Sequence, residues 1–165
     1  MWGFWNAWMA STEQPASCGV CDLHESTEAC RSYEISRDRH WILRHHPDPA
    51  PLTGWLLLDA RRHMAGPLEF NPEEASCWGA AVQQASRLVQ ELTGCDRVYA
   101  IAFGEGARHL HLHLLPRFGS EPASEAWKVA DLYRAVTAGS RPAAAPETVA
   151  QFVERARQAH LTSAP

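Results

Sequence analysis

The sequence predicts a single α+β domain in which short strands and one long helix share a core. A long amphipathic pattern falls between segments of strand length in chain order, which is typical of this fold class. The length of 165 residues suits one domain, and no apolar segment approaches the roughly 18 residues that span a bilayer. The helix is expected over 71–94 and the strands over 41–44, 54–58, 97–103 and 109–115.

The chain divides into three predicted parts. A Trp-rich N-terminal arm covers residues 1–16, the α+β domain covers 17–120, and a helical C-terminal extension over 121–165 packs on the same domain. The arm is either an irregular tail or an aromatic segment that packs on a partner subunit, and both interpretations remain open. The extension has helical patterns over about 124–138 and 146–161.

The first strands flank a proline-rich loop. Three prolines between residues 47 and 51 exclude a helix after the 41–44 strand. The run from Gly54 to Leu58 is apolar and of strand length, so it fits a central strand buried on both faces.

The predicted long helix has clear signals at both ends. Asn71 can cap it, Pro72 suits the first helical position, and Glu74 completes a capping box. Gly94 supplies the left-handed stop. One apolar stripe follows the helical period through Trp78, Val82, Ala85, Val89 and Leu92.

The segment 109–115 carries the most informative pattern. Because side chains on a strand alternate between faces, His109, His111 and His113 share one face while three leucines occupy the other. A half-exposed strand could carry histidine by chance, but exposed strand faces are normally filled with Thr, Lys or Glu. The pattern therefore indicates a cleft lined by imidazoles.

Composition limits the compartment and the partners. The net charge of -4 argues against a nucleic-acid polymer, which favours a basic surface. The chain has five cysteines, an odd number, and its first nine residues lack the pattern of a secretion signal. We therefore expect a cytoplasmic protein without a membrane anchor, whose cysteines are thiols or metal ligands.

Cys18 and Cys21 form a Cys-x-x-Cys motif. Such a pair can be a redox pair, half of a metal site or a chance occurrence, and no thioredoxin-like βαβ pattern surrounds it. Two thiolates at this spacing supply half of a tetrahedral zinc site.

The alternating histidines and the order of elements over 18–117 resemble the histidine triad superfamily of nucleotide hydrolases and transferases. The resemblance implies an antiparallel sheet with one long helix across it, a homodimer, and a nucleotide or nucleotide conjugate as substrate. It also implies that His111 attacks the α-phosphorus of an AMP-type nucleotide to give a nucleotidyl-histidine, with His113 assisting as a donor.

The same resemblance assigns binding roles. The turn Gly104-Glu105-Gly106 occupies the place of a phosphate-binding Gly-Gln-Ser/Thr segment, Asp48 is the nearest candidate for a ribose contact, and Arg117 is a candidate donor. Glu105 departs from this pattern, because it stands where the segment has Gln. An ionised carboxylate at this place would repel a phosphate group.

The resemblance to zinc-containing triad proteins also implies a zinc site. His63 and His109 would complete the site that Cys18 and Cys21 begin. Four protein ligands would make the metal structural rather than catalytic. Two alternatives remain open: a metal-free chain, and a site that uses His24 or Cys30.

Two other functions stay open at this point. The imidazoles could hold a catalytic metal with open positions in an oxygenase or isomerase. Alternatively, the protein could bind a nucleotide without turning it over, a possibility raised by Glu105.

Overall fold

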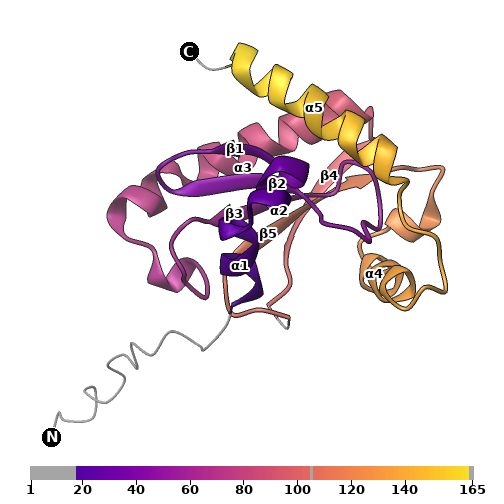
Figure 1. The fold of residues 1–165 in the computed structure, drawn as a ribbon, viewed down its shortest axis with the longest axis horizontal. Coiled ribbons are helices and arrows are strands. Elements are labelled where there is room, and N and C mark those ends of the chain that lie inside the picture. The colour runs from indigo at the N-terminus through magenta and orange to yellow at the C-terminus, as the bar shows by residue number, and fades with distance from the viewer. Residues whose placement is uncertain (1–17, 105, 164–165) are drawn as a thin grey trace, which may run out of the picture.

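A computed structural model describes residues 18–104 and 106–163 of the chain. Within these residues one five-stranded antiparallel sheet has the order β1-β2-β3-β5-β4 (Figure 1). The strands are β1 (Glu34–Arg37), β2 (Trp41–His45), β3 (Leu56–Ala60), β4 (Arg97–Ala102) and β5 (His111–Arg117). The helices are α1 (Gly19–Glu25), α2 (Thr27–Tyr33), α3 (Pro72–Thr93), α4 (Val129–Thr137) and α5 (Pro146–Ser163). The predicted fold class, an antiparallel sheet with one long helix, is confirmed.

Helix α3 begins and ends where its sequence signals predict. The Asn71 side chain accepts a hydrogen bond from the Glu74 amide, and the Glu74 carboxylate accepts one from the Asn71 amide. Gly94 ends the helix in the left-handed conformation, with φ of 67°. Helix α3 lies beside α5 (Figure 1).

The two faces of the sheet bury different cores. One face carries the main core, in which leucines of β3 and β5 pack beneath α3 and α5. The opposite face carries a smaller core, in which Trp55 and Leu115 pack against α4. Alternation along β5 separates them, because Leu112 and Leu114 belong to the first core and Leu115 to the second.

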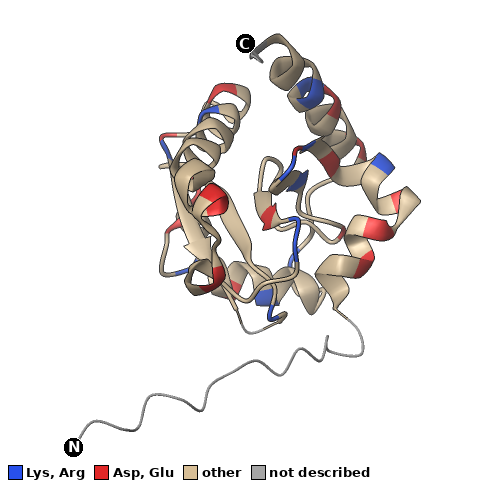
Figure 2. Cartoon of the chain, turned by 90° about the vertical axis from the view of Figure 1, so that its left-hand side faces the viewer, with Lys and Arg blue, Asp and Glu red and all other residues tan. Residues whose placement is uncertain are grey.

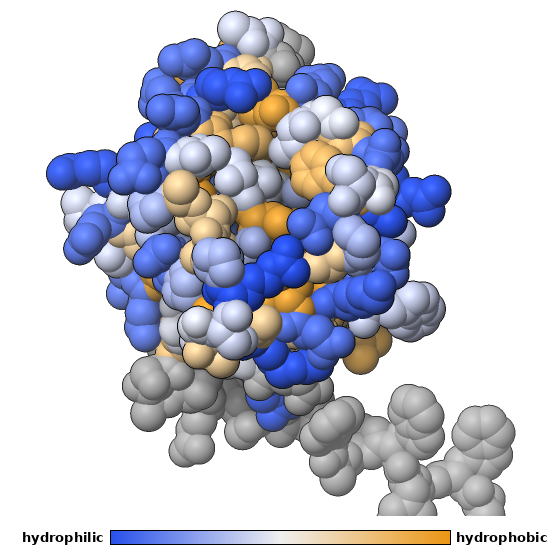
Figure 3. Space-filling view, turned by 90° about the vertical axis from the view of Figure 1, so that its right-hand side faces the viewer, coloured by the Kyte–Doolittle hydropathy of each residue, from blue (hydrophilic) through white to orange (hydrophobic). Residues whose placement is uncertain are grey.

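The C-terminal extension covers both faces. Residues of α4 reach the smaller core, and on that side of the molecule hydrophobic side chains gather at the middle with hydrophilic ones around them (Figure 3). Acidic and basic residues are mixed along α5 (Figure 2). Among the described residues, no helix has both the length and the apolar character needed to cross a membrane.

Several elements differ from the sequence prediction. Strand β1 and the short helices α1 and α2 were not predicted, because none of them is long enough for a periodic pattern. The central strand β3 begins at Leu56 rather than Gly54. Strand β5 begins at His111, so His109 lies just before it. The Trp-rich arm over 1–16 lies outside the described residues.

Gly54, in the turn before β3, provides a test of the packing. Its φ is +83°, and an added Cβ would come within 2.4 Å of Thr93 Cγ2 and 3.3 Å of Phe152 Cε2. We predict that Gly54→Ala lowers the free energy of unfolding by about 2–4 kcal/mol, because it adds backbone strain and a clash.

Gly139 is the matched control, because it also has a positive φ, of +70°, but no atom lies within 4 Å of the added Cβ. Gly139→Ala should cost about 1 kcal/mol, from backbone strain alone. Urea unfolding measures both, and equal losses in the two variants would show that the packing around Gly54 is not as described.

Candidate functional site

His111 opens β5 and is held with one ring nitrogen free. Its Nδ1 lies 2.5 Å from the carbonyl oxygen of His109. Because a carbonyl oxygen only accepts, Nδ1 carries the proton and donates it. The lone pair is therefore on Nε2, and the half-buried ring can present it to a reactant.

His113 has the opposite tautomer to His111. The Trp55 indole N–H donates to His113 Nδ1 at 2.9 Å, so the His113 proton is on Nε2. That Nε2 is buried and has no hydrogen-bond partner among the described atoms. Burial, followed by the nearby His111 and His46 rings, lowers the pKa of His113 to about 3. His113 is thus a neutral donor, with its ring 5.2 Å from that of His111.

An aromatic wall beside the two histidines consists of His46, Trp55, Phe103 and Tyr133. Phe103 lies 5.0 Å from His113 between ring centroids, and His46 lies 5.5 Å from Tyr133 and 6.5 Å from His113. Sequence reasoning missed His46 and Tyr133 as site residues. His46 directly precedes Pro47 of the predicted loop and has no assigned role there, and Tyr133 lies 20 residues after His113.

His46 has a defined hydrogen-bonding state. Its Nδ1 donates to the carbonyl oxygen of Pro47 at 2.7 Å, which leaves Nε2 as an acceptor. Burial lowers the pKa of His46 to about 4, despite the opposing hydrogen bond to Pro47. The ring is therefore a neutral acceptor at pH 7.

The neighbouring His45 is structural. Its Nδ1 donates to the carbonyl oxygen of His46, and its Nε2 accepts from the Gly54 amide at 2.9 Å. Both ring nitrogens are used within the protein, so His45 ties together the two ends of the proline-rich loop.

A compact group of four metal-ligating side chains lies next to the triad. One ligand atom from each of these residues lies within 4.8 Å of the other three. Cys18 Sγ is 3.5 Å from His109 Nδ1, and Cys21 Sγ is 3.4 Å from the same atom. His63 Nδ1 lies 3.5 Å from Cys21 Sγ. The structure thus brings together the four predicted ligands Cys18, Cys21, His63 and His109.

These distances suit tetrahedral zinc. Zn–S bonds of about 2.3 Å and Zn–N bonds of about 2.0–2.1 Å at tetrahedral angles place sulfur and nitrogen about 3.5 Å apart. His109 Nε2 donates to the carbonyl oxygen of Ala60 at 2.7 Å, which leaves Nδ1 free to ligate. Burial and the neighbouring Cys18 raise the pKa of Cys21 to about 11, a direction that a bound cation reverses.

The three triad imidazoles do not converge on a single ion. The ligating atom of His109 faces the two thiols, whereas His111 Nδ1 donates to backbone and His113 Nδ1 accepts from Trp55. Among the described residues, the only triad member in a metal-ligating group is His109. This arrangement does not match the catalytic-metal alternative.

The structure does not gather every predicted residue at the triad. Gly104 lies near it, because Gly104 follows Phe103 directly and Phe103 packs on His113, whereas Glu105 lies outside the described residues. Asp48 instead lines a cavity with residues of α2 and α5. Arg117 lies at the far end of β5, where its guanidinium donates to Ser124 Oγ.

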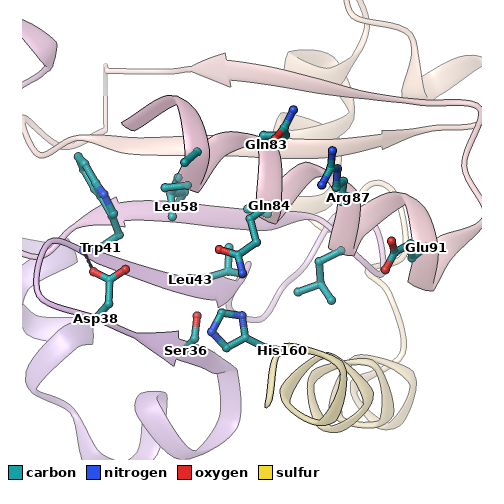
Figure 4. Close-up of a pocket in the computed structure, with 14 residues that line it drawn as sticks. Ser36, Asp38, Trp41, Leu43, Leu58, Gln83, Gln84, Arg87, Glu91 and His160 are labelled. Atoms are coloured by element: carbon teal, nitrogen blue, oxygen red, sulfur yellow. Dashed lines mark hydrogen bonds between the residues drawn. The ribbon is translucent and has the colours of Figure 1, made fainter. Parts of the chain in front are cut away.

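A groove of about 410 Å³ lies on the opposite face of the sheet, between α3, the β1–β2 hairpin and α5 (Figure 4). Its floor includes Leu43 and Leu58, and Arg87, Glu91 and His160 surround it. It contains no residue of the triad or of the metal group.

Solved structures share this fold. A zinc-bound histidine triad family protein from Mycobacterium smegmatis matches with a TM-score of 0.63 at 17% identity, covering 90% of this chain and 98% of that one. A histidine triad protein from Bradyrhizobium japonicum matches with a TM-score of 0.59 at 19% identity, covering 81% and 94%. A Hit-like protein from Bartonella henselae matches with a TM-score of 0.58 at 16% identity, covering 85% and 92%.

The fold that the sequence resemblance implied is therefore confirmed: this chain has the histidine triad fold. No family model matches the sequence, and no curated protein sequence is significantly similar. At these identities the likeness establishes the fold alone.

Three of the four buried histidines, His45, His46 and His113, have strongly lowered pKa values, which makes stability depend on pH. Burial lowers the pKa of His45 to about 4, as it does for His46, and that of His113 to about 3. The unfolded chain takes up these protons below about pH 6.5 and the folded chain does not, so stability falls as the pH drops. We predict a loss of about 1 kcal/mol per histidine between pH 7 and pH 5.5.

Urea unfolding with a chelator present, at both pH values, measures this loss without a contribution from metal release. Equal stability at pH 7 and pH 5.5 would contradict the neutral state of the three buried rings.

Proposed function

We propose that this protein is a nucleotide hydrolase or nucleotidyltransferase that acts on the α-phosphate of an AMP-type nucleotide through His111. The observation that carries the proposal is the free Nε2 lone pair of His111 beside the buried, unpartnered Nε2–H of His113. One nitrogen is a nucleophile and the other a donor, as a phosphoryl-type transfer requires.

In the first step, His111 Nε2 attacks the α-phosphorus. An N–P bond forms, the bond from phosphorus to the leaving group breaks, and the leaving group departs with that electron pair. The His111 ring becomes positively charged while its Nδ1–H donates to the His109 carbonyl oxygen. A hydrogen bond from a charged donor is stronger than one from a neutral donor, so this contact stabilises the developing charge.

In the second step, water or another acceptor attacks the same phosphorus. The N–P bond breaks, its electron pair returns to His111 Nε2, and the acceptor releases its proton to solvent water. The neutral His113 Nε2–H and the backbone amides of Gly104 and Gly106 are the donors that we assign to the phosphate oxygens.

We place the nucleoside part of the substrate against the aromatic wall beside His111 and His113. His46 Nε2 offers an acceptor, and Tyr133 is 40% exposed beside it, so a planar ligand group can lie against these rings. The proposal does not include Asp48 or Arg117 as substrate contacts, because Asp48 lines the cavity beside α2 and α5 and the Arg117 guanidinium donates to Ser124 Oγ.

Zinc is the metal that the four-residue group fits best. The Cys2His2 donor set and the sulfur–nitrogen distances support it, and the zinc in a structure of the same fold adds weight. Bound zinc would be structural and would supply no open coordination position. Cys18 and Cys21 would then be linked to His109, two residues before the nucleophile.

A homodimer is also part of the proposal. Strand β4 lies at the edge of the sheet, where a second copy can continue it.

The direct test of the reaction is the covalent intermediate. We predict that wild type, quenched in acid-free denaturant during turnover of adenosine phosphoramidate or diadenosine polyphosphate, gains the mass of one adenylyl group (AMP less one water) on the peptide containing His111. His111→Ala should lose the adduct and at least about 10³-fold in kcat/KM, because it removes the nucleophile.

His160→Ala is the matched control, since it removes an imidazole from the opposite face of the sheet and should leave the adduct unchanged. Turnover without any adduct, or an adduct that persists in His111→Ala, would exclude this mechanism. Tight nucleotide binding without turnover by wild type would instead support the non-catalytic alternative.

The metal site has its own test. Wild type should contain one zinc per chain by mass spectrometry of metals, and Cys18→Ser should lose it together with several degrees of Tm, because binding contributes to folding. Cys77→Ser, on α3, should keep the zinc. Equal metal content in wild type and Cys18→Ser would contradict the assignment.

A further inference from the structure

A buried carboxylate lies between the metal group and the strand of His111, and neither proposed step uses it. Asp59 on β3 pairs with His111 on β5 and is fully buried. Its Oδ2 accepts from His24 Nε2 at 2.8 Å and from Arg44 Nε at 2.6 Å. One carboxylate oxygen of β3 therefore connects strand β2 with helix α1.

Helix α1 is held at its C-terminal end, where Arg37 Nη2 donates to the His24 carbonyl oxygen at 3.0 Å, but the helix itself buries little side-chain surface. It has seven residues, it has no side-chain cap at its N-terminus, and Val20 is its one buried residue. A helix this short is not stable alone in water. Yet Cys18 immediately precedes it and Cys21 lies within it, so both thiols depend on where it sits.

His24, near the end of α1, links the helix to two parts of the site. Its ring packs edge-on against His109, with 5.4 Å between ring centroids, while its Nε2 donates to Asp59. His24 and its partner Asp59 therefore link the helix that carries Cys21 to the ring of His109.

Keeping Asp59 and Arg44 ionised in the protein interior costs desolvation free energy. Burial alone would raise the pKa of Asp59, but the charge of Arg44 and the hydrogen bonds from His24 and Arg44 outweigh it and keep the pKa below its usual value. Asp59 Oδ1 and Arg44 Nη1 are also buried without a hydrogen-bond partner among the described atoms. A buried ion pair commonly stabilises no more than apolar residues of the same size, so stability does not explain it.

We propose that His24 and Asp59 are positioning residues that fix α1 on the sheet and so place Cys18 and Cys21 for metal binding. The network acts on the metal through the helix and not by contact with it. This inference rests on the proposed metal site and is independent of the proposed reaction at His111.

The test is the zinc dissociation constant of the full chain, measured by chelator competition. His24→Ala should bind zinc about 10–100-fold more weakly than wild type, in the range found for partners of metal ligands. His24→Gln keeps a donor that can reach Asp59 and should recover most of the affinity. His160→Ala should match wild type.

Cobalt-loaded protein supplies a second readout. The His24→Ala variant should retain the thiolate-to-cobalt absorption band at saturating metal, which shows that the ligands remain and only their placement has changed. A variant with both Asp59→Leu and Arg44→Leu leaves no unpaired charge, and it should fold and show the same weakened zinc binding.

Zinc binding by His24→Ala and by the double variant within about twofold of wild type would overturn the inference and leave the metal site intact. A wild-type chain that binds no zinc would overturn both. Neither result bears on the His111 adduct, so failure of the proposed reaction remains distinguishable.

Discussion

The antiparallel pairing of β3 with β5 is the constraint on which the rest of the site depends. Its register sets Leu56 opposite Leu114 and Leu58 opposite Leu112 in the main core, and sets Asp59 opposite His111 on the other face. A slip of one residue would exchange the two faces of a strand. Burial of the leucines therefore fixes where the imidazoles stand.

Given that register, hydrogen bonds rather than charge define the reactive groups. The His109 carbonyl oxygen and the Trp55 indole assign opposite tautomers to His111 and His113. Both partners are held by the fold, because His109 is a buried member of the metal group and Trp55 is fully buried beneath α4. Such orientation before the substrate arrives is what makes electrostatic stabilisation effective.

Local sequence signals predicted a large part of this structure. Helix α3 could be placed to within a residue because both its ends carry strong capping signals, and the alternation in 109–115 identified the reactive face. The four metal ligands followed from the family resemblance, and the structure gathers them. The capping signals and the alternating histidines each lie within one short segment, whereas the metal ligands needed the resemblance to relate three separate segments.

The remainder depends on contacts between distant segments. Helix α1 is too short for a periodic pattern, and the role of Asp59 appears only when β2, β3 and α1 are assembled. Tyr133 reaches His46 only through the packing of α4. Asp48 looked close to the site in sequence, but its loop directs it toward α2 and α5.

The most direct test of the central claim is the tautomeric state of the two histidines, which long-range ¹H–¹⁵N correlation spectra report. At neutral pH the account predicts the Nδ1–H form for His111 and the Nε2–H form for His113, with His113 still neutral at pH 5. The reverse assignment, averaged tautomers, or protonation of His113 near pH 6.5 would contradict it.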